Sequence, residues 1–325
     1  MKTAAFRREL TVAAVLGVML VALGLRAPGF FRLENLRDLV VDNALVLLPA
    51  IGMTAVILCH EIDLSVGSVF ALVCISAGHL AKAGCPVPLL LLAGPLLGAV
   101  CGFVNATLVV GLGIPSIIAT LAMMVGLRGA LQWLTQGAWV RDLPPGFTWF
   151  GLGQAAGQAL IVTLAAILFC ALAWLLRNVG AGRALYAVGS DAEAARLMGI
   201  RPRRVVTGAL VALGALTGLA AVLGATRFVA VQSGAGAGLE LQVIACVVVG
   251  GTSILGGRGT LGGTLLGVAL LGVIGTALTF LHANAAWERA IQGLIILVAM
   301  LGERSHSVDR LASAAGTVVG KGVAA

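Results

Sequence analysis

Ten long apolar runs, separated by short polar segments, restrict how this chain can fold more than any other feature. A helix needs about 20 apolar residues to cross the hydrocarbon core of a bilayer. The chain is 60% hydrophobic and 10% charged, whereas soluble domains are roughly 45–50% apolar and 25% charged. The sequence therefore predicts an all-α integral membrane protein with about ten transmembrane helices. The runs cover residues 10–27, 39–58, 64–82, 86–111, 114–134, 154–176, 205–226, 239–255, 261–281 and 288–302.

Residues 239–255 form a short run that glycine clusters bound on both sides. Irregular backbone is tolerated at membrane depth where protein buries it or where it lines a cavity. Two outcomes are therefore open for this run: it crosses the membrane, or it is re-entrant. The run at 10–27 has no A-x-A cleavage motif after it, so we expect an uncleaved first span.

The positive charges predict which way the chain crosses the membrane. If all ten runs cross, 13 of the 21 Lys and Arg residues lie on the N-terminal side, 7 lie on the other side, and Arg128 lies within a run. Loops rich in Lys and Arg stay in the cytoplasm. We therefore expect one transmembrane domain, 1–325, with both termini cytoplasmic. The net charge of +8 is then explained by orientation in the membrane and not by binding to nucleic acid. Its cytoplasmic parts are the N-terminus 1–9, the loop 177–204 and a flexible tail, 303–325.

The loop 177–204 contains a short predicted helix at 191–200. Ser190 or Asp191 can cap its N-terminus, and Gly199 can end it. Two interpretations stand: a solvated connector, or a docking element for a cytoplasmic partner that buries the stripe Ala194, Leu197 and Met198.

A polar segment, Cys59–Ser68, interrupts the apolar sequence between the second and third runs. Asp63 and Ser65 are placed to cap the helix that follows, and Gly67 leaves room for a neighbouring helix. His60 and Glu61 either face the mouth of a path or form a solvated turn.

Glycines four residues apart predict close helix packing at Gly94–Gly102, Gly214–Gly218 and Gly263–Gly267. Residues 102–108 faintly resemble residues 272–278, which suggests two structural repeats. If each repeat has five spans, the second is inverted. The G-x-G-x-x-G at 257–262 joins two runs, not a strand and a helix, so a tight turn is favoured over a dinucleotide site.

Several motifs follow one another along residues 35–300: Ile62–Ser68, Ile118–Leu121 with Arg128-Gly129, Gly182-Arg183, Tyr186–Gly189, Glu193–Ala195 with Gly199-Ile200, Gly236–Leu241, and Val249–Ser253 with Gly256–Gly259. Together they resemble the ribose-type monosaccharide permeases of ATP-binding-cassette (ABC) importers. Residues 139–144 look more like the rhamnose and autoinducer-2 branches, whereas His60-Glu61, Gln242 and residues 275–277 depart from the common pattern.

The resemblance implies a non-catalytic, multi-pass permease subunit of the bacterial inner membrane. It would need no cofactor of its own, since separate cassette ATPase subunits would use the ATP. A periplasmic sugar-binding protein would deliver a ribose-, rhamnose- or autoinducer-2-like monosaccharide. A second permease subunit, either a copy or a paralogue, would complete the path.

The residue types and the resemblance together suggest which residues would contact a sugar and which would contact an ATPase. Hydroxyl, amide and carboxylate side chains suit sugar hydroxyls, and the expected pathway residues are Asp63, Ser65, Ser68, Asn105, Thr120 and Glu240. The expected ATPase-coupling residues are Asp191, Glu193, Ala194, Ala195, Leu197, Gly199 and Ile200. No metal site is expected, because the four histidines are scattered without a second ligand nearby.

A proton-coupled secondary sugar carrier, with Glu61, Asp63 or Glu240 as proton relay, is the alternative. Such a carrier gives the loop 177–204 no task. A membrane enzyme would need a nucleophile–base or metal pair, and the sequence offers none.

Overall fold

The part of the chain that the structure describes is built from helices. The computed structural model describes residues 2–281, 284, 287 and 289–297, and within these residues only an isolated bridge between Val140 and Val231 has strand pairing. The α-helices are α1 (Lys2–Arg26), α2 (Leu33–Leu58), α3 (Val66–Lys82), α4 (Val87–Ala106), α5 (Ser116–Thr135), α6 (Gln154–Asn178), α7 (Gly180–Ser190), α8 (Ala192–Leu197), α9 (Pro202–Ala225), α10 (Leu239–Val249) and α11 (Leu261–Phe280). Shorter turns are η1 (Pro28–Phe31), η2 (Thr107–Gly111) and η3 (Thr148–Gly151).

Seven of these helices are long and apolar enough to cross a membrane: α1, α2, α4 with η2, α5, α6, α9 and α11. This confirms the prediction of an all-α integral membrane protein. Two apolar runs give shorter helices, α3 with 17 residues and α10 with 11. At 1.5 Å per residue α10 is about 16 Å long, too short to cross a core of about 30 Å. Of the tenth run, 288–302, residues 289–297 are helical and the rest lies outside the described residues, as does the tail 303–325.

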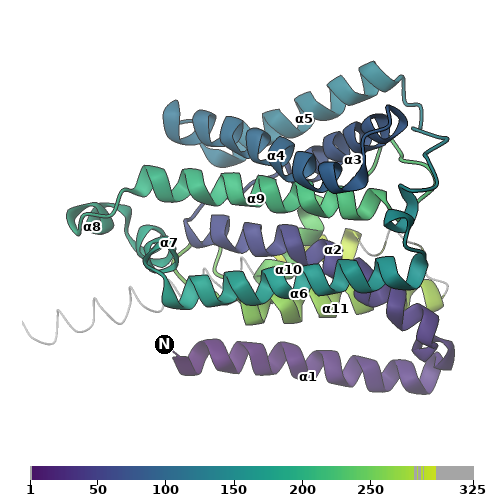
Figure 1. The fold of residues 1–325 in the computed structure, drawn as a ribbon. Helices are drawn as coiled ribbons and strands as arrows, with labels where there is room; N and C mark the ends of the chain where they lie inside the picture. Colours follow the sequence, from purple (N-terminus) through teal and green to yellow (C-terminus); the bar gives the residue numbers. More distant parts are fainter. Residues whose placement is uncertain (1, 282–283, 285–286, 288, 298–325) are drawn as a thin grey trace, which may run out of the picture.

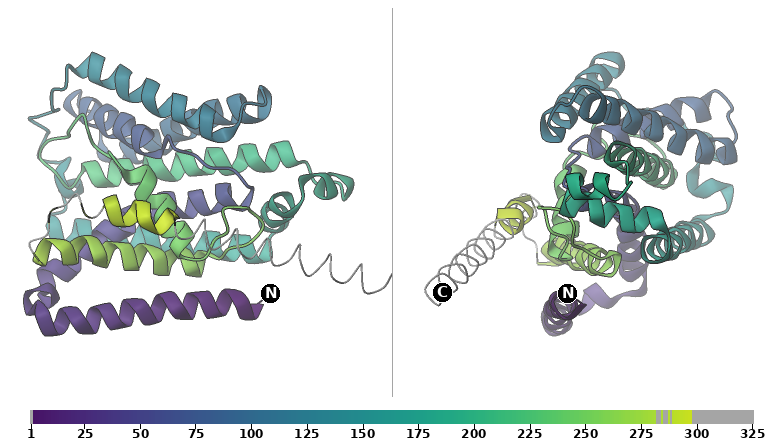
Figure 2. Two further views of the ribbon diagram at one scale, coloured as in Figure 1. Left: turned by 180° about the vertical axis from the view of Figure 1, so that it is seen from behind. Right: turned by 90° about the vertical axis from the view of Figure 1, so that its left-hand side faces the viewer.

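Helix α9 is the centre of the bundle (Figure 1), since it contacts α2, α3 and α4. On one side α5 covers α3 and α4, and on the other α6, α10 and α11 pack against α2. Helix α1 packs on α11 at the margin of the bundle, which Figure 2 shows from the end where α7 and α8 lie. We call that end the α8 end.

The seam between α4 and α9 is made by glycines on both helices. A Cβ added to Gly98 would lie under 3.0 Å from the carbonyl oxygen of Gly214, and one added to Gly218 equally close to that of Gly94. Real Cβ atoms do not approach backbone so closely, so only glycine allows this contact. The predicted faces Gly94–Gly102 and Gly214–Gly218 are thus confirmed, and they prove to be partners of each other. The third predicted face, Gly263–Gly267, packs on the end of α10, where added Cβ atoms would lie under 3.0 Å from the carbonyl oxygens of Gly250 and Cys246.

Helices α1, α5 and α6 are the least buried of the seven long apolar helices, since less than a fifth of each apolar window is buried. Exposed apolar side chains such as Val18, Val125 and Ile167 belong to them. In a membrane this is the surface that lipid covers. Helices α2 and α9, with more than half of their windows buried, form the interior.

Helix ends differ from the apolar runs where polar residues continue a helix. Helix α1 begins at Lys2, so the predicted N-terminal segment 1–9 is helical from its second residue, and α2 begins at Leu33, six residues before its run. Polar residues form helices readily, because helix propensity does not depend on being apolar.

The two short apolar helices occupy comparable places, α3 directly before α4 and α10 directly before α11. Residues 102–108 begin in α4 and continue into η2, and residues 272–278 lie in α11. Helices α2 and α9 lie side by side and run in opposite directions along the bundle (Figure 1). The arrangement agrees with two repeats of opposite orientation.

Candidate sugar path and coupling loop

The segment between α2 and α3 is irregular and is held by a buried carboxylate. Asp63 Oδ1 accepts hydrogen bonds from the Ser65 amide at 2.7 Å and the Ser65 hydroxyl at 2.6 Å. Asn105, from the last turn of α4, donates from Nδ2 to Asp63 Oδ2 at 2.9 Å and lies 2.8 Å from Ser65 Oγ. All three side chains are buried. The structure thus brings together three predicted pathway residues in one cluster.

Helix α5 binds two further amides of this segment. The amide of Leu64 donates to Thr120 Oγ1 at 3.0 Å, and the amide of Ile62 donates to Ser116 Oγ at 3.3 Å. Irregular backbone away from water needs such partners, because an unpaired buried amide costs several kcal/mol. Thr120 therefore holds the segment in place, and Ser116, which the sequence did not single out, shares that role.

The sequence predicted that the Ser65 side chain caps α3, but it does not. Its hydroxyl is taken up by Asp63, and its carbonyl oxygen accepts from the amides of Ser68 and Val69 and from the Ser68 hydroxyl at 2.8 Å. The capping prediction was wrong because an Asp two residues before a Ser can bind it locally. The α3 N-terminus is instead anchored by the backbone carbonyl of residue 65.

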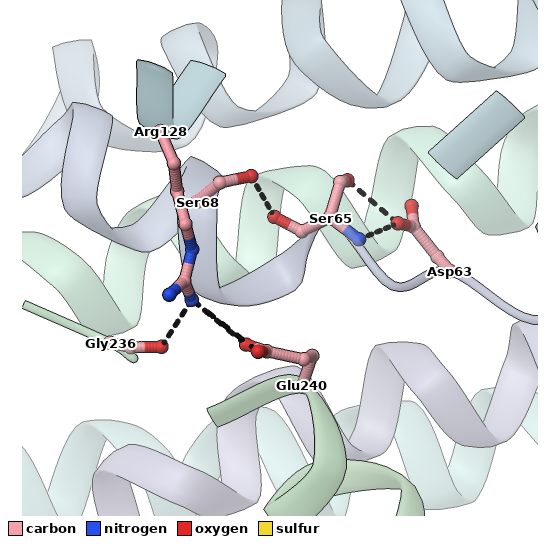
Figure 3. Close-up of polar contacts among 6 residues, drawn as sticks. All are labelled: Asp63, Ser65, Ser68, Arg128, Gly236 and Glu240. Atoms are coloured by element: carbon pink, nitrogen blue, oxygen red, sulfur yellow. Dashed lines mark hydrogen bonds and ion pairs between the residues drawn. The ribbon is translucent and has the colours of Figure 1, made fainter. Parts of the chain in front are cut away.

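The sixth pathway residue, Glu240, forms an ion pair that the sequence did not reveal (Figure 3). Arg128 Nη2 of α5 lies 3.2 Å from Glu240 Oε2 at the start of α10 and 3.4 Å from the carbonyl oxygen of Gly236. Glu240 is buried, and the Arg128 side chain is about one third exposed. A lone arginine in one apolar run and a lone glutamate in another were the available signal, since an isolated membrane charge seeks a counter-charge.

Gly67 lets α3 pass between these groups. A Cβ at Gly67 would lie under 3.0 Å from Glu240 Oε2, from the Gly236 carbonyl oxygen and from Arg128 Nη2. The prediction that Gly67 leaves room for a neighbour is confirmed, although the neighbours are an ion pair and a turn. The arrangement ties α3, α5 and α10 together.

The six predicted pathway residues are packed against protein and do not line an open cavity large enough for a sugar. The cavity next to Asp63, Ser65 and Asn105 is about 10 Å³, room for about one water molecule. Pockets for small ligands are ~300–1,000 Å³. A larger cavity, about 710 Å³, lies between the ends of α3 and α5 away from the α8 end and is lined in part by His79, Lys82, Trp139 and Arg141.

The loop 177–204 is largely helical. Asp191 caps α8, its Oδ1 accepting from the amides of Glu193 and Ala194 at 2.9 Å each, and Gly199 takes a positive φ of 83° after the helix. The predicted short helix is therefore confirmed over 192–197. Helix α7 was missed, because its three glycines at 180, 182 and 189 lower helix propensity.

The predicted coupling residues divide into a buried and an exposed set. Ala195 is buried, and Ile200 is partly buried against the core. Leu197 and Met198 are 79% and 83% exposed. Two large apolar side chains thus stand in solvent beside each other at the α8 end, on a helix with a defined cap.

Comparison with known proteins gives one consistent family. Residues 35–300 match the family described as branched-chain amino acid transport system / permease component. The chain is 35% identical to the autoinducer 2 import system permease protein LsrC of Yersinia pseudotuberculosis serotype O:1b (strain IP 31758), over 89% of this chain and 83% of the relative. It is 34% identical to the ribose import permease protein RbsC of Escherichia coli (strain K12), over 92% of this chain and 94% of the relative. No solved structure matches the chain. The chain is therefore a member of this permease family, a multi-pass membrane protein whose relatives are components of import systems.

Proposed function

We propose that the chain is the permease subunit of an ABC importer that moves a ribose-, rhamnose- or autoinducer-2-like monosaccharide through the bacterial inner membrane. A periplasmic binding protein delivers the sugar, cassette ATPases supply the energy, and a second permease subunit completes the path. The observation that carries the ATPase-driven mechanism is α8, a capped helix that presents Leu197 and Met198 to solvent. A self-sufficient carrier has no use for that surface.

The orientation follows from the positive charges. With both termini cytoplasmic, the α8 end faces the cytoplasm, where the ATPases are, and the larger cavity between α3 and α5 faces outward. The proposed sugar path follows the contacts among α3, α4, α5 and α10, where Asp63, Asn105 and Glu240 lie. In the closed arrangement the polar groups bond to one another, and separation of these helices frees them for sugar hydroxyls.

The secondary-carrier alternative gains no support from Asp63 and Glu240, two of the three carboxylates that could act as its relay. A proton relay needs a carboxylate that can exchange a proton during transport. Asp63 accepts three hydrogen bonds, from two Ser65 groups and from Asn105, and Glu240 is paired with Arg128. Both carboxylates serve as structural acceptors here.

Sugar uptake into proteoliposomes tests the proposal. With the cassette ATPase inside and the binding protein outside, uptake is expected to require ATP and to persist when the proton gradient is collapsed. Uptake by the chain alone, driven by a pH gradient, would show a secondary carrier instead. Titration of the binding protein against a panel of monosaccharides identifies the sugar.

Replacing Leu197 and Met198 together by serine is expected to weaken ATPase association about tenfold or more, since burying each side chain is worth ~1.5–3 kcal/mol. Thermal stability should not change, because both side chains are exposed. Co-purification and titration of the detergent-solubilised permease with its ATPase measure the effect. The matched control is Val229→Ser, an apolar residue that is 76% exposed at the opposite end. Wild-type ATPase affinity in the double variant would place the docking surface elsewhere.

A further inference from the structure

Two turns meet at the α8 end through the side chain of His60. The first turn follows α2, and the second lies between α10 and α11. His60 Nδ1 lies 2.8 Å from the carbonyl oxygen of Leu255. A carbonyl can only accept, so the imidazole donates from Nδ1. One side-chain hydrogen bond thus joins two turns that are 195 residues apart in sequence.

The backbone at His60 has a conformation that is uncommon for residues other than glycine. Its φ is +67°, in the left-handed region that glycine and asparagine enter most easily. The side chain is exposed, so burial does not explain the residue. The hydrogen bond to the Leu255 carbonyl is the contact that accounts for a histidine at this position. Gly256, next to Leu255, has φ +79°, and a Cβ there would lie 3.0 Å from His60 Cβ.

Helix α7 rests on both turns at once. A Cβ at Gly189 would lie under 3.0 Å from the Leu58 carbonyl oxygen and from the Gly257 amide nitrogen. That amide itself donates to the Leu58 carbonyl at 3.0 Å. Tyr186 donates from its hydroxyl to the carbonyl of Gly259 at 3.0 Å, and burial raises the pKa of its phenol, which keeps that donor protonated.

We propose that His60 is a positioning residue that couples the α7–α8 unit to the sugar path by holding the two turns together. The inference rests on the proposed function, because it assigns the route by which ATPase docking reaches the path. Asp191 joins α7 directly to α8, and its amide bonds the Ala187 carbonyl at 3.1 Å. Asp63, the centre of the buried polar cluster, follows His60 by three residues.

The geometry shows what the bond adds. Movement of α8 carries Gly189 and Ser190 with it, and these residues touch Leu58 and Gly257. With the His60 bond made, the turn before α3 and the turn before α11 move as one unit. Without it, the described residues keep one direct hydrogen bond between the two turns, from the Gly257 amide to the Leu58 carbonyl oxygen.

Two substitutions separate the backbone conformation from the hydrogen bond. His60→Gly accepts the positive φ but has no donor, whereas His60→Asn accepts the positive φ and keeps an amide donor. The complete importer in proteoliposomes is assayed for sugar transported per ATP hydrolysed. His60→Gly is expected to lower this ratio about fivefold, the population change that loss of one ordinary hydrogen bond produces. His60→Asn is expected to keep most of the wild-type ratio.

Gln136→Gly is the matched control at the opposite end. Gln136 also has a positive φ, +51°, and its Nε2 donates to the Trp133 carbonyl at 2.7 Å. This variant should leave the ratio unchanged. A wild-type ratio in His60→Gly would overturn the inference. An equal loss in His60→Asn and His60→Gly would overturn it as well, because the donor would then have no effect.

A second measurement does not depend on transport. Cys59 is buried directly beside His60. The background carries Cys85→Ser and Cys170→Ser, which remove the two cysteines that are not fully buried. The rate at which maleimide labels Cys59 then reports how often the two turns separate. The rate is expected to rise about fivefold in His60→Gly and not in His60→Asn. An unchanged labelling rate would show that the His60 hydrogen bond does not hold the two turns together. Wild-type uptake that needs no ATP would instead contradict the proposed function.

Discussion

Replacing Gly214 by alanine is expected to destabilise the subunit by about 3 kcal/mol or more, the upper end of the cost of overpacking a core. The added Cβ meets the carbonyl group of Gly98 on α4 under 3.0 Å, and backbone cannot rotate away as a side chain can. The whole α4–α9 seam must open to accept it. The melting temperature of the purified protein in detergent measures the loss.

Gly208→Ala is the matched control, because it makes the same change six residues earlier on the same helix. Nothing lies within 4 Å of a Cβ at Gly208. Alanine is favoured over glycine inside a helix by roughly 0.5–1 kcal/mol, so this variant should melt at or above the wild-type temperature. Equal melting temperatures for the two variants would mean that α4 and α9 are not in backbone contact.

Arg128→Met is expected to destabilise the protein by about 3 kcal/mol, since it leaves the Glu240 carboxylate buried without its cation. The double variant Arg128→Met/Glu240→Met should recover most of that loss, because an apolar pair of similar volume suits a membrane interior. The same melting measurement, made on both single variants and the double variant, gives the coupling energy.

Arg141→Met serves as the control for removing an arginine. Its guanidinium lies 5.8 Å from the Trp139 ring centroid, and the side chain is exposed, so the expected cost is at most about 1 kcal/mol. Strictly additive losses at Arg128 and Glu240 would show that the two charges do not stabilise each other.

The sequence predicted the parts of the fold that depend on local composition. Apolar length gave the helices, and glycine spacing gave the packing faces of α4 and α9, because both properties repeat along one helix. It also gave the cap of α8, since Asp191 and its amides are neighbours in sequence. The short length of α10 followed from the glycines on either side of it.

The contacts between distant segments could not be predicted from one sequence. Arg128 and Glu240 are 112 residues apart, and His60 and Leu255 are 195 apart. The lone charges of Arg128 and Glu240 signal that each needs a partner, but no local pattern shows which residue that partner is. The predicted pathway residues were chosen as polar residues in apolar surroundings, but the hydrogen bonds among them depend on how α4 and α5 pack on the segment before α3.

The glycine seam also decides which parts of the subunit can move. Two helices whose backbones touch through several glycine positions cannot slide past each other without separating, because each position fits one register only. Helices α4 and α9 therefore behave as a rigid spine. Any change of shape that opens a path must take place around it, in the outer helix α5 and in the short helix α3. Helix α10 is itself interlocked with α11, because a Cβ at Gly263 would lie under 3.0 Å from the carbonyl oxygen of Gly250 and one at Gly267 equally close to that of Cys246.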